Sequence, residues 1–61
     1  MKKSKLIRHL IRHNCELLRE GGRHSIWKNK DSGTMTAVPR HQEIKDLMAR
    51  KICQDLDIPK P

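Results

Sequence analysis

The alternation of apolar and polar positions predicts a short helix near the start of the chain, over residues 4–13. Four apolar side chains recur there at helical spacing and share one side of the helix: Leu6, Ile7, Leu10 and Ile11. Ser4 stands where a hydroxyl could cap the first turn. Because the apolar stripe is short and lacks an aromatic anchor, we expect the helix to pack on a small core rather than on a membrane surface.

Three short segments then have the composition of strands, at residues 15–19, 23–28 and 34–38. Gly21-Gly22 separates the first from the second, and Asp31-Ser32-Gly33 separates the second from the third, and both are typical turn sequences. Pro39 follows the third segment and cannot donate to a strand ladder. The pattern predicts an antiparallel meander of three strands.

A second helix is predicted over residues 43–56, where apolar side chains repeat every four residues: Ile44, Met48, Ile52 and Leu56, with Leu47 alongside. Glu43 would lie in its first turn, which suits the helix dipole. The expected fold is a single α+β domain over residues 1–61, in the order α-β-β-β-α. We expect both amphipathic helices on one face of the sheet, with the other face free.

The charge of the chain is concentrated in its first half. The formal net charge is +7 and the sequence pI is about 10.0. Residues 1–30 hold nine lysines and arginines against Glu16 and Glu20, whereas residues 31–61 are balanced. This asymmetry favours a polyanionic partner, either nucleic acid or an acidic protein, over a surface that only keeps the protein soluble. So small a domain has little room for a deep cavity, which favours a polymeric substrate.

The cysteines and the apolar runs exclude several other classes. Cys15 and Cys53 are far apart and form no Cys-x-x-Cys motif, so no zinc framework is indicated. The charged start lacks the apolar segment of a signal peptide, and no run is long enough to span a membrane. We expect a cytoplasmic protein with no membrane partner, in which a disulfide would be unneeded.

Two motifs open the second strand and close the third. The first is Gly22-Arg23-His24-Ser25-Ile26-Trp27, and the second is Val38-Pro39-Arg40-His41. Their order and spacing, together with the closing segment 49–58, resemble the HicA toxin family over residues 4–58. In that family a Gly-Ser-His-type motif opens the second strand, so Arg23 replaces the usual serine. The fold of the family resembles the double-stranded-RNA-binding domain.

The resemblance implies a toxin of a type II toxin–antitoxin system that cleaves messenger RNA without a metal or another cofactor. It assigns the cleavage to His24 and implies a HicB-type antitoxin that binds and blocks the toxin. The chemistry suits a histidine, because its ordinary pKa of about 6.5 permits proton transfer near neutral pH. The nucleophile would be the 2′-hydroxyl of the RNA, so DNA would not be a substrate.

Several further residues are candidates for this site. Arg23 and Lys28 would contact phosphate beside His24, and three more basic residues complete the expected RNA-binding set: Lys30, Lys5 and Arg12. His41 is either a second proton-transfer residue or a polar neighbour of the second helix. His9 and His13 are spaced like a metal-binding pair, but no further ligands accompany them.

Trp27, the only aromatic residue, is expected in the core rather than stacked on a base, although the pattern does not decide whether Trp27 or Ile26 is buried. Two other functions are compatible with the sequence. One is a non-catalytic RNA-binding module of the double-stranded-RNA-binding type, which the balanced charge of the second helix disfavours. The other is a small subunit whose basic half binds an acidic protein.

The lack of a carboxylate cluster or a Cys/His ligand set predicts metal-independent cleavage. RNA cleavage by the purified protein should persist at the same rate in excess chelator, measured by gel electrophoresis of a labelled transcript. Complete loss of cleavage that a divalent ion restores would contradict this prediction.

Overall fold

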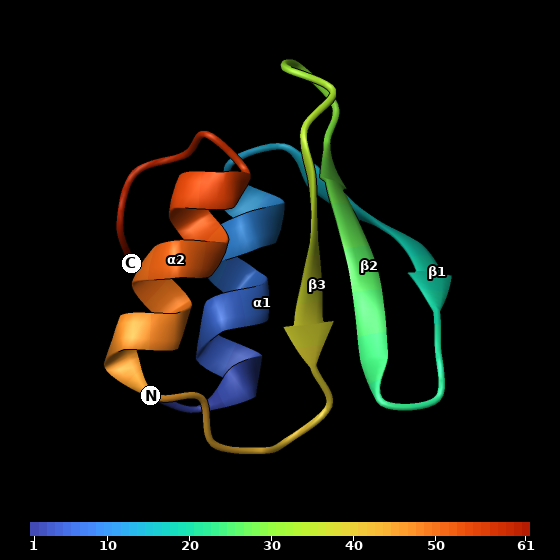
Figure 1. Cartoon of the computed structure of the whole chain (residues 1–61). Helices are drawn as coiled ribbons and strands as arrows, with labels where there is room; N and C mark the ends of the chain where they lie inside the picture. Colours follow the sequence, from blue (N-terminus) through green and yellow to red (C-terminus); the bar gives the residue numbers. More distant parts are fainter.

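The computed structural model describes all residues from Met1 to Pro61. Its elements in chain order are α1 (Lys3–Arg12), β1 (Cys15–Glu20), β2 (His24–Asn29), β3 (Met35–Pro39) and α2 (Asp46–Asp55). The strands form one antiparallel sheet in the order β1-β2-β3. Both helices lie on the same side of this sheet (Figure 1), so the predicted α+β fold and element order are confirmed.

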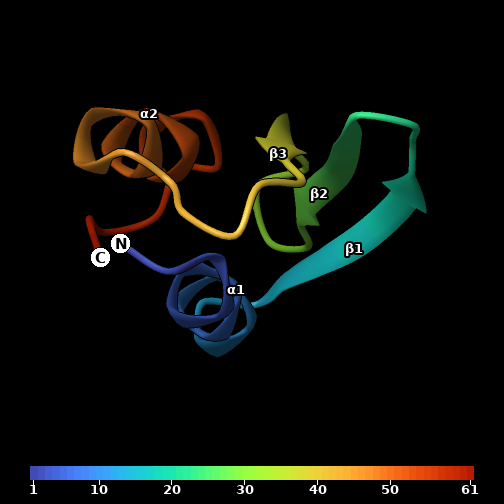
Figure 2. The ribbon, with the colours of Figure 1, turned by 90° about the horizontal axis from the view of Figure 1, so that it is seen from below.

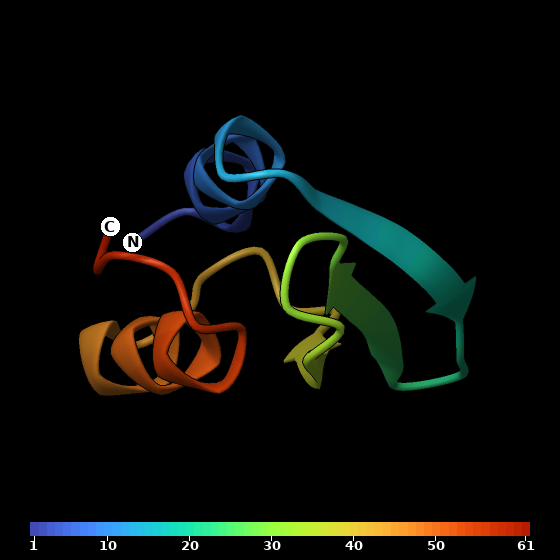
Figure 3. The same cartoon turned by 90° about the horizontal axis from the view of Figure 1, so that it is seen from above.

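The views from below and from above show that the other side of the sheet has no element against it (Figures 2 and 3). We call the side that faces the helices the inner face and the opposite side the outer face. Neither ten-residue helix has the length and apolar character that a membrane span requires.

The core fills the space between the inner face and the two helices. Along β2, alternate residues are buried on the inner face: Ser25, Trp27 and Asn29. Trp27 is only 6% exposed, which confirms the prediction that it belongs to the core and leaves Ile26 on the outer face. The apolar core has ten members: Leu6, Leu10, Cys15, Trp27, Val38, Ile44, Ala49, Ile52, Cys53 and Leu56.

The prediction that Ser4 caps α1 is wrong. The capping residue is Lys2, and no side chain bonds to the exposed amides of the first turn. Instead the backbone N–H of Lys3 donates to the carbonyl oxygen of Gln42, with a distance of 2.8 Å. A backbone partner from a distant segment therefore satisfies one of the amides that the first turn of a helix leaves free.

The second helix begins three residues later than predicted, at Asp46. Ile44 is buried but precedes the helix, because its N–H donates to the Met1 carbonyl oxygen at 2.8 Å in an extended pairing of the two segments. Glu43 forms an isolated β-bridge with Lys2 and does not belong to the first helical turn. Residues 42–44 therefore pair with residues 1–3 in an extended conformation instead of forming the first turn of the helix.

Three apolar residues assigned to the buried stripes are exposed: Ile11, Leu47 and Met48. The inner side of α2 is instead Ala49, Ile52 and Cys53, with Leu56 following as the capping residue. Each helix is followed by a residue with positive φ, at Asn14 (66°) and Asp57 (57°). Asparagine and aspartate tolerate the left-handed conformation that ends a helix better than most residues.

Asn29 is the polar residue that joins the sheet to the end of α2. Its Nδ2 donates to the Leu56 carbonyl oxygen at 2.7 Å, and its Oδ1 accepts from the Asp31 amide at 2.8 Å. The side chain is buried, so neither bond can be replaced easily by water. Asn29 therefore holds the β2–β3 turn and the second helix together.

Replacement of Asn29 should destabilise the fold more than surface changes do. Asn29→Ala should lower the free energy of unfolding by about 1–3 kcal/mol, because it leaves a buried carbonyl without a donor. Asn29→Asp keeps the acceptor for Asp31 but loses the donor to Leu56, so it should also destabilise. Gln54→Ala, at an exposed position of α2, is the control and should stay within about 0.5 kcal/mol in urea unfolding. Equal stability of the three variants would contradict the role of Asn29.

Candidate functional site

His24 stands at the start of β2, directly after the hairpin that joins β1 to β2. It is exposed, and it lies on the outer face because its neighbour Ser25 is buried on the inner one. In the ladder its partner is Pro39, the last residue of β3. The imidazole of His24 is therefore attached to the first residue of the central strand, at the end of the sheet where the β1–β2 hairpin lies.

Gly21 holds the backbone of His24 at close range. Its N–H donates to the His24 carbonyl oxygen at 2.8 Å. A Cβ on Gly21 would lie 2.7 Å from that oxygen, whereas a Cβ on Gly22 would meet nothing within 4 Å. Neither glycine has a positive φ. The hairpin thus needs glycine at position 21 for steric reasons. At position 22 there is space for a larger side chain.

Arg40 connects the end of β3 to the same hairpin. The sequence alone assigns it no role. Its Nη1 donates to the Gly21 carbonyl oxygen at 3.1 Å, and its Nε lies 3.6 Å from a carboxylate oxygen of Glu20. Its backbone N–H donates to the Arg23 carbonyl oxygen at 3.3 Å. A signal was available in the sequence, because a meander places the residue after Pro39 opposite the Gly-Gly turn.

The structure brings three of the predicted site residues to one end of the sheet. Arg23 is exposed in the hairpin, next to His24. His41 is exposed and follows two residues after Pro39, the ladder partner of His24. Two imidazoles and the guanidinium of Arg23 therefore share this end with Arg40. We call it the hairpin end.

Lys28 and Lys30 lie progressively further from the hairpin end. Lys28 is on the outer face, four residues along β2 from His24, which corresponds to about 13 Å of extended strand. Lys30 follows the strand, and its N–H donates to the Asn14 carbonyl oxygen at 3.1 Å, which places it beside the end of α1. Lys30 and His24 therefore stand at opposite ends of the sheet.

Lys5 and Arg12 form a separate basic surface on α1. Together with Arg8 and His9 they line a hollow of about 300 Å³ that Met1 and Pro61 also border. The Nε2–H of His9 donates to the Pro59 carbonyl oxygen at 2.7 Å, which fastens the end of the chain there. The predicted RNA-binding residues are therefore divided among three surfaces rather than gathered around His24.

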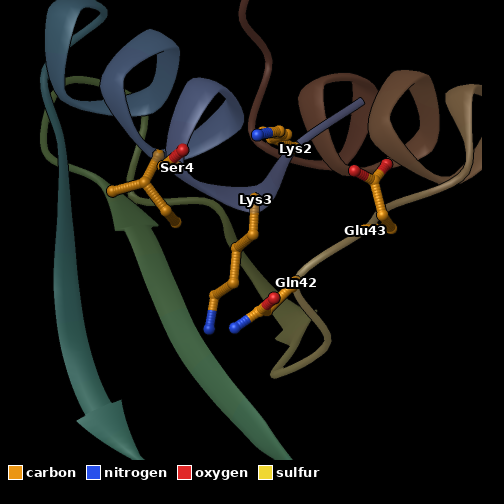
Figure 4. Close-up of a pocket in the computed structure, with 6 residues that line it drawn as sticks. Lys2, Lys3, Ser4, Gln42 and Glu43 are labelled. Atoms are coloured by element: carbon orange, nitrogen blue, oxygen red, sulfur yellow. The ribbon is translucent and has the colours of Figure 1, made fainter.

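A further hollow of about 560 Å³ opens beside the start of α1 (Figure 4). It is lined by Lys2, Lys3, Ser4, Ile7, Gln42 and Glu43. The side chains of Lys3 and Gln42 extend side by side, one from α1 and the other from the loop that precedes α2 (Figure 4). The start of α1 lies at the same end of the molecule as the hairpin (Figure 1), so these lysines add positive charge near the hairpin end.

The remaining reactive side chains are the two cysteines, which are free and buried. Burial raises the pKa of the Cys15 thiol, and the charge of Asp31 raises it further. Burial also raises the pKa of Cys53, with Cys15 as the second cause. Both therefore remain neutral thiols at pH 7, which makes them poor nucleophiles. No three His, Cys, Asp or Glu side chains are grouped so that they could hold a metal ion.

Comparison with known families defines the class of protein. The family model described as HicA toxin of bacterial toxin-antitoxin matches residues 4–58, nearly the whole chain. That match places the protein among the toxins of toxin–antitoxin systems. The chain belongs to the HicA toxin family. No curated protein and no solved structure matches it.

The contrast between the two hairpin glycines gives a matched pair of variants. Gly21→Ala should lower the free energy of unfolding by about 1–3 kcal/mol, because the added methyl group must push the hairpin away from the His24 carbonyl. Gly22→Ala meets open space and should leave stability within about 0.5 kcal/mol. Urea unfolding measures the stability of both variants. A Gly22→Ala variant that is the less stable of the two would refute this account.

Proposed function

We propose that this toxin is a metal-independent endoribonuclease that cleaves messenger RNA with His24 and thereby stops translation and growth. The observation that carries the proposal is the placement of His24. Its imidazole is exposed at the start of the central strand, its backbone is hydrogen-bonded to Gly21, and the exposed residue Arg23 precedes it in the hairpin. This is the position that the family motif assigns to the cleaving histidine.

The reaction needs two proton transfers and one nucleophilic attack. The 2′-oxygen of the RNA attacks the adjacent phosphorus and loses its proton to a base, while the bond to the 5′-oxygen of the next nucleotide breaks. That leaving oxygen takes a proton from an acid. The products are a 2′,3′-cyclic phosphate and a free 5′-hydroxyl. His24 serves as base or acid in this scheme, and His41, at the same end of the sheet, is the candidate for the other transfer.

Positive charge at the hairpin end would stabilise the phosphorane, which carries more negative charge than the starting phosphodiester. Arg23 is exposed beside His24 and has no carboxylate within ion-pair distance, so its charge is available to the RNA. Arg40 is paired with Glu20 and acts mainly by positioning the hairpin. Lys28, further along the outer face, would contact a neighbouring phosphate of the same strand.

The two surfaces that lie away from His24 would contribute to affinity rather than to the reaction. Lys5 and Arg12 on α1, and Lys30 beyond β2, are exposed basic residues that can release counterions from RNA without touching the scissile bond. The partner that the toxin class implies is an antitoxin, which we take to be of the HicB type. An acidic surface on it would be attracted by the +7 charge of the toxin.

The test compares His24→Ala with His41→Ala. His24 is exposed and its side chain makes no hydrogen bond in the structure, so its removal should leave the free energy of unfolding within about 0.5 kcal/mol. Loss of its proton transfer should slow RNA cleavage by roughly 10²–10⁴-fold. The variant should no longer arrest growth when expressed, yet should still bind RNA, since the basic residues remain.

The measurements are single-turnover cleavage of a labelled transcript and growth after induction. A matched transcript with one 2′-deoxynucleotide at the cleavage position is the chemical control and should resist the wild-type protein. Wild-type cleavage by a folded His24→Ala would show that the mechanism is wrong. Loss of cleavage in His41→Ala alone would move the assignment to the other histidine. RNA binding without any cleavage by the wild-type protein would favour a non-catalytic RNA-binding module.

A further inference from the structure

The hollow beside the start of α1 lies next to His41, the candidate for the second proton transfer. Gln42, which lines the hollow, directly follows His41 in the loop between β3 and α2. That loop begins against the hairpin, because the backbone N–H of Arg40 donates to the Arg23 carbonyl oxygen at 3.3 Å. Gln42 is two residues after Arg40, which is at most about 7 Å of chain. A strand of RNA held at the hairpin end therefore has the hollow within reach.

The backbone around Gln42 is held by pairing with the segment that opens α1. The Gln42 carbonyl oxygen accepts from the Lys3 N–H at 2.8 Å, and the next residue, Glu43, forms a β-bridge with Lys2. The side chain of Gln42 therefore projects from a fixed point of the backbone. This reduces the ordering that binding of a ligand would cost.

The polar side chains of the hollow are free to bind a ligand. The amide of Gln42 is exposed and forms no hydrogen bond within the chain, and it extends beside the Lys3 ammonium (Figure 4). Lys2 and Lys3 have no carboxylate within ion-pair distance, because the carboxylate of the lining, that of Glu43, lies 3.5 Å from the Met1 amino nitrogen instead. The hollow thus presents an uncompensated cation and an unpaired amide side by side.

This combination matches one nucleotide of an RNA strand. The hollow of about 560 Å³ is within the range of small-molecule sites, about 300–1,000 Å³. Ile7, which is half-buried, supplies an apolar wall for the flat face of a base, and the Lys3 ammonium can bind a phosphate. The amide of Gln42 offers one donor and one acceptor group. A glutamine amide pairs with adenine through two bonds at once, to the N6 amine and to N7.

Two other occupants would use these groups less completely. A free inorganic anion would engage the lysines but would leave the acceptor oxygen of Gln42 and the apolar wall of Ile7 without a partner. An acidic protein segment would have the same shortcoming and would also meet the carboxylate of Glu43. An RNA strand that passes the hairpin end brings a phosphate and a base together, so it satisfies the cation, the amide and the apolar wall.

We propose that this hollow is a base-binding subsite, in which Gln42 selects adenine and Lys3 holds a phosphate of a nucleotide beside the cleaved bond. The proposal rests on the RNA cleavage proposed above and adds its sequence preference. Gln42 is a specificity-determining residue and takes no part in the proton transfers. Selection depends on hydrogen bonds rather than on aromatic stacking, because Trp27, the only aromatic residue, is buried on the inner face.

The test uses transcripts that are identical except at the nucleotides on either side of a mapped cleavage position, where all four bases are compared. The wild-type protein should cleave transcripts with adenine at one of these positions about 5–100-fold faster, measured as kcat/KM, which is the discrimination of one bidentate base contact. Gln42→Ala should reduce this ratio to within about twofold, by slowing cleavage of the adenine transcripts. Gln42→Glu keeps an acceptor but loses the donor, so it should also reduce the ratio.

Gln54→Ala is the matched control, because Gln54 is an exposed glutamine on α2 that does not line the hollow, and it should keep the wild-type ratio. Lys3→Ala should raise KM for all transcripts alike and weaken its salt dependence while the ratio stays, the signature of a phosphate contact. Thermal unfolding checks that each variant is folded.

An unchanged ratio in Gln42→Ala, an equal loss in Gln54→Ala, or a wild-type protein without a base preference would overturn the proposal. Loss of antitoxin binding in Gln42→Ala with the ratio unchanged would assign the hollow to a protein and would overturn it too.

Failure of the proposed function would be visible separately in this design. If the wild-type protein cleaves no RNA, the nuclease is rejected, and the affinities of wild type and Gln42→Ala for oligoadenylate and oligouridylate still decide whether the hollow selects adenine. If the wild-type protein cleaves normally and Gln42→Ala has the same ratio, only the subsite is rejected.

Discussion

The two ten-residue helices and the three-stranded sheet provide eight buried apolar side chains, and Ile44 and Leu56 beside α2 add two more, enough for one layer of core and no second one. A sheet in so small a domain can be covered on one face only, and the chain assigns Ser25, Trp27 and Asn29 of its central strand to that face. This constraint determines which side chains of the sheet remain on its uncovered face. The other residues of the same strand, His24, Ile26 and Lys28, alternate with them and lie on the outer face, where they can contact other molecules.

The position of His24 depends on backbone pairing more than on side-chain packing. Gly21 is hydrogen-bonded to its carbonyl, Pro39 is its ladder partner, and Arg40 links the two segments through the Gly21 carbonyl. In the proposed reaction this fixed backbone would hold the imidazole of His24 at the surface, where a polymeric substrate can reach it.

The sequence predicted the fold well because its turns are marked by glycine, proline and aspartate, and its apolar period changes clearly between helix and strand. It failed at residues 42–46, where Ile44 fits a helical repeat but pairs with Met1, a contact of high sequence separation that no local pattern contains. The same limit applies to the site. His24 follows from its motif, but the separation of Lys30, Lys5 and Arg12 from it depends on strand length and on which side of α1 meets the C-terminal segment.

The shift in register between Leu17 and Arg19 makes a β-bulge at Leu18, which has an evolutionary consequence. Because Leu18 has no ladder partner and Met35 is at the start of an edge strand, substitutions at these positions cost little stability, whereas Gly21 and Asn29 are constrained by their contacts. Substitutions can therefore accumulate at these exposed positions of the sheet while the hairpin that carries His24 stays the same.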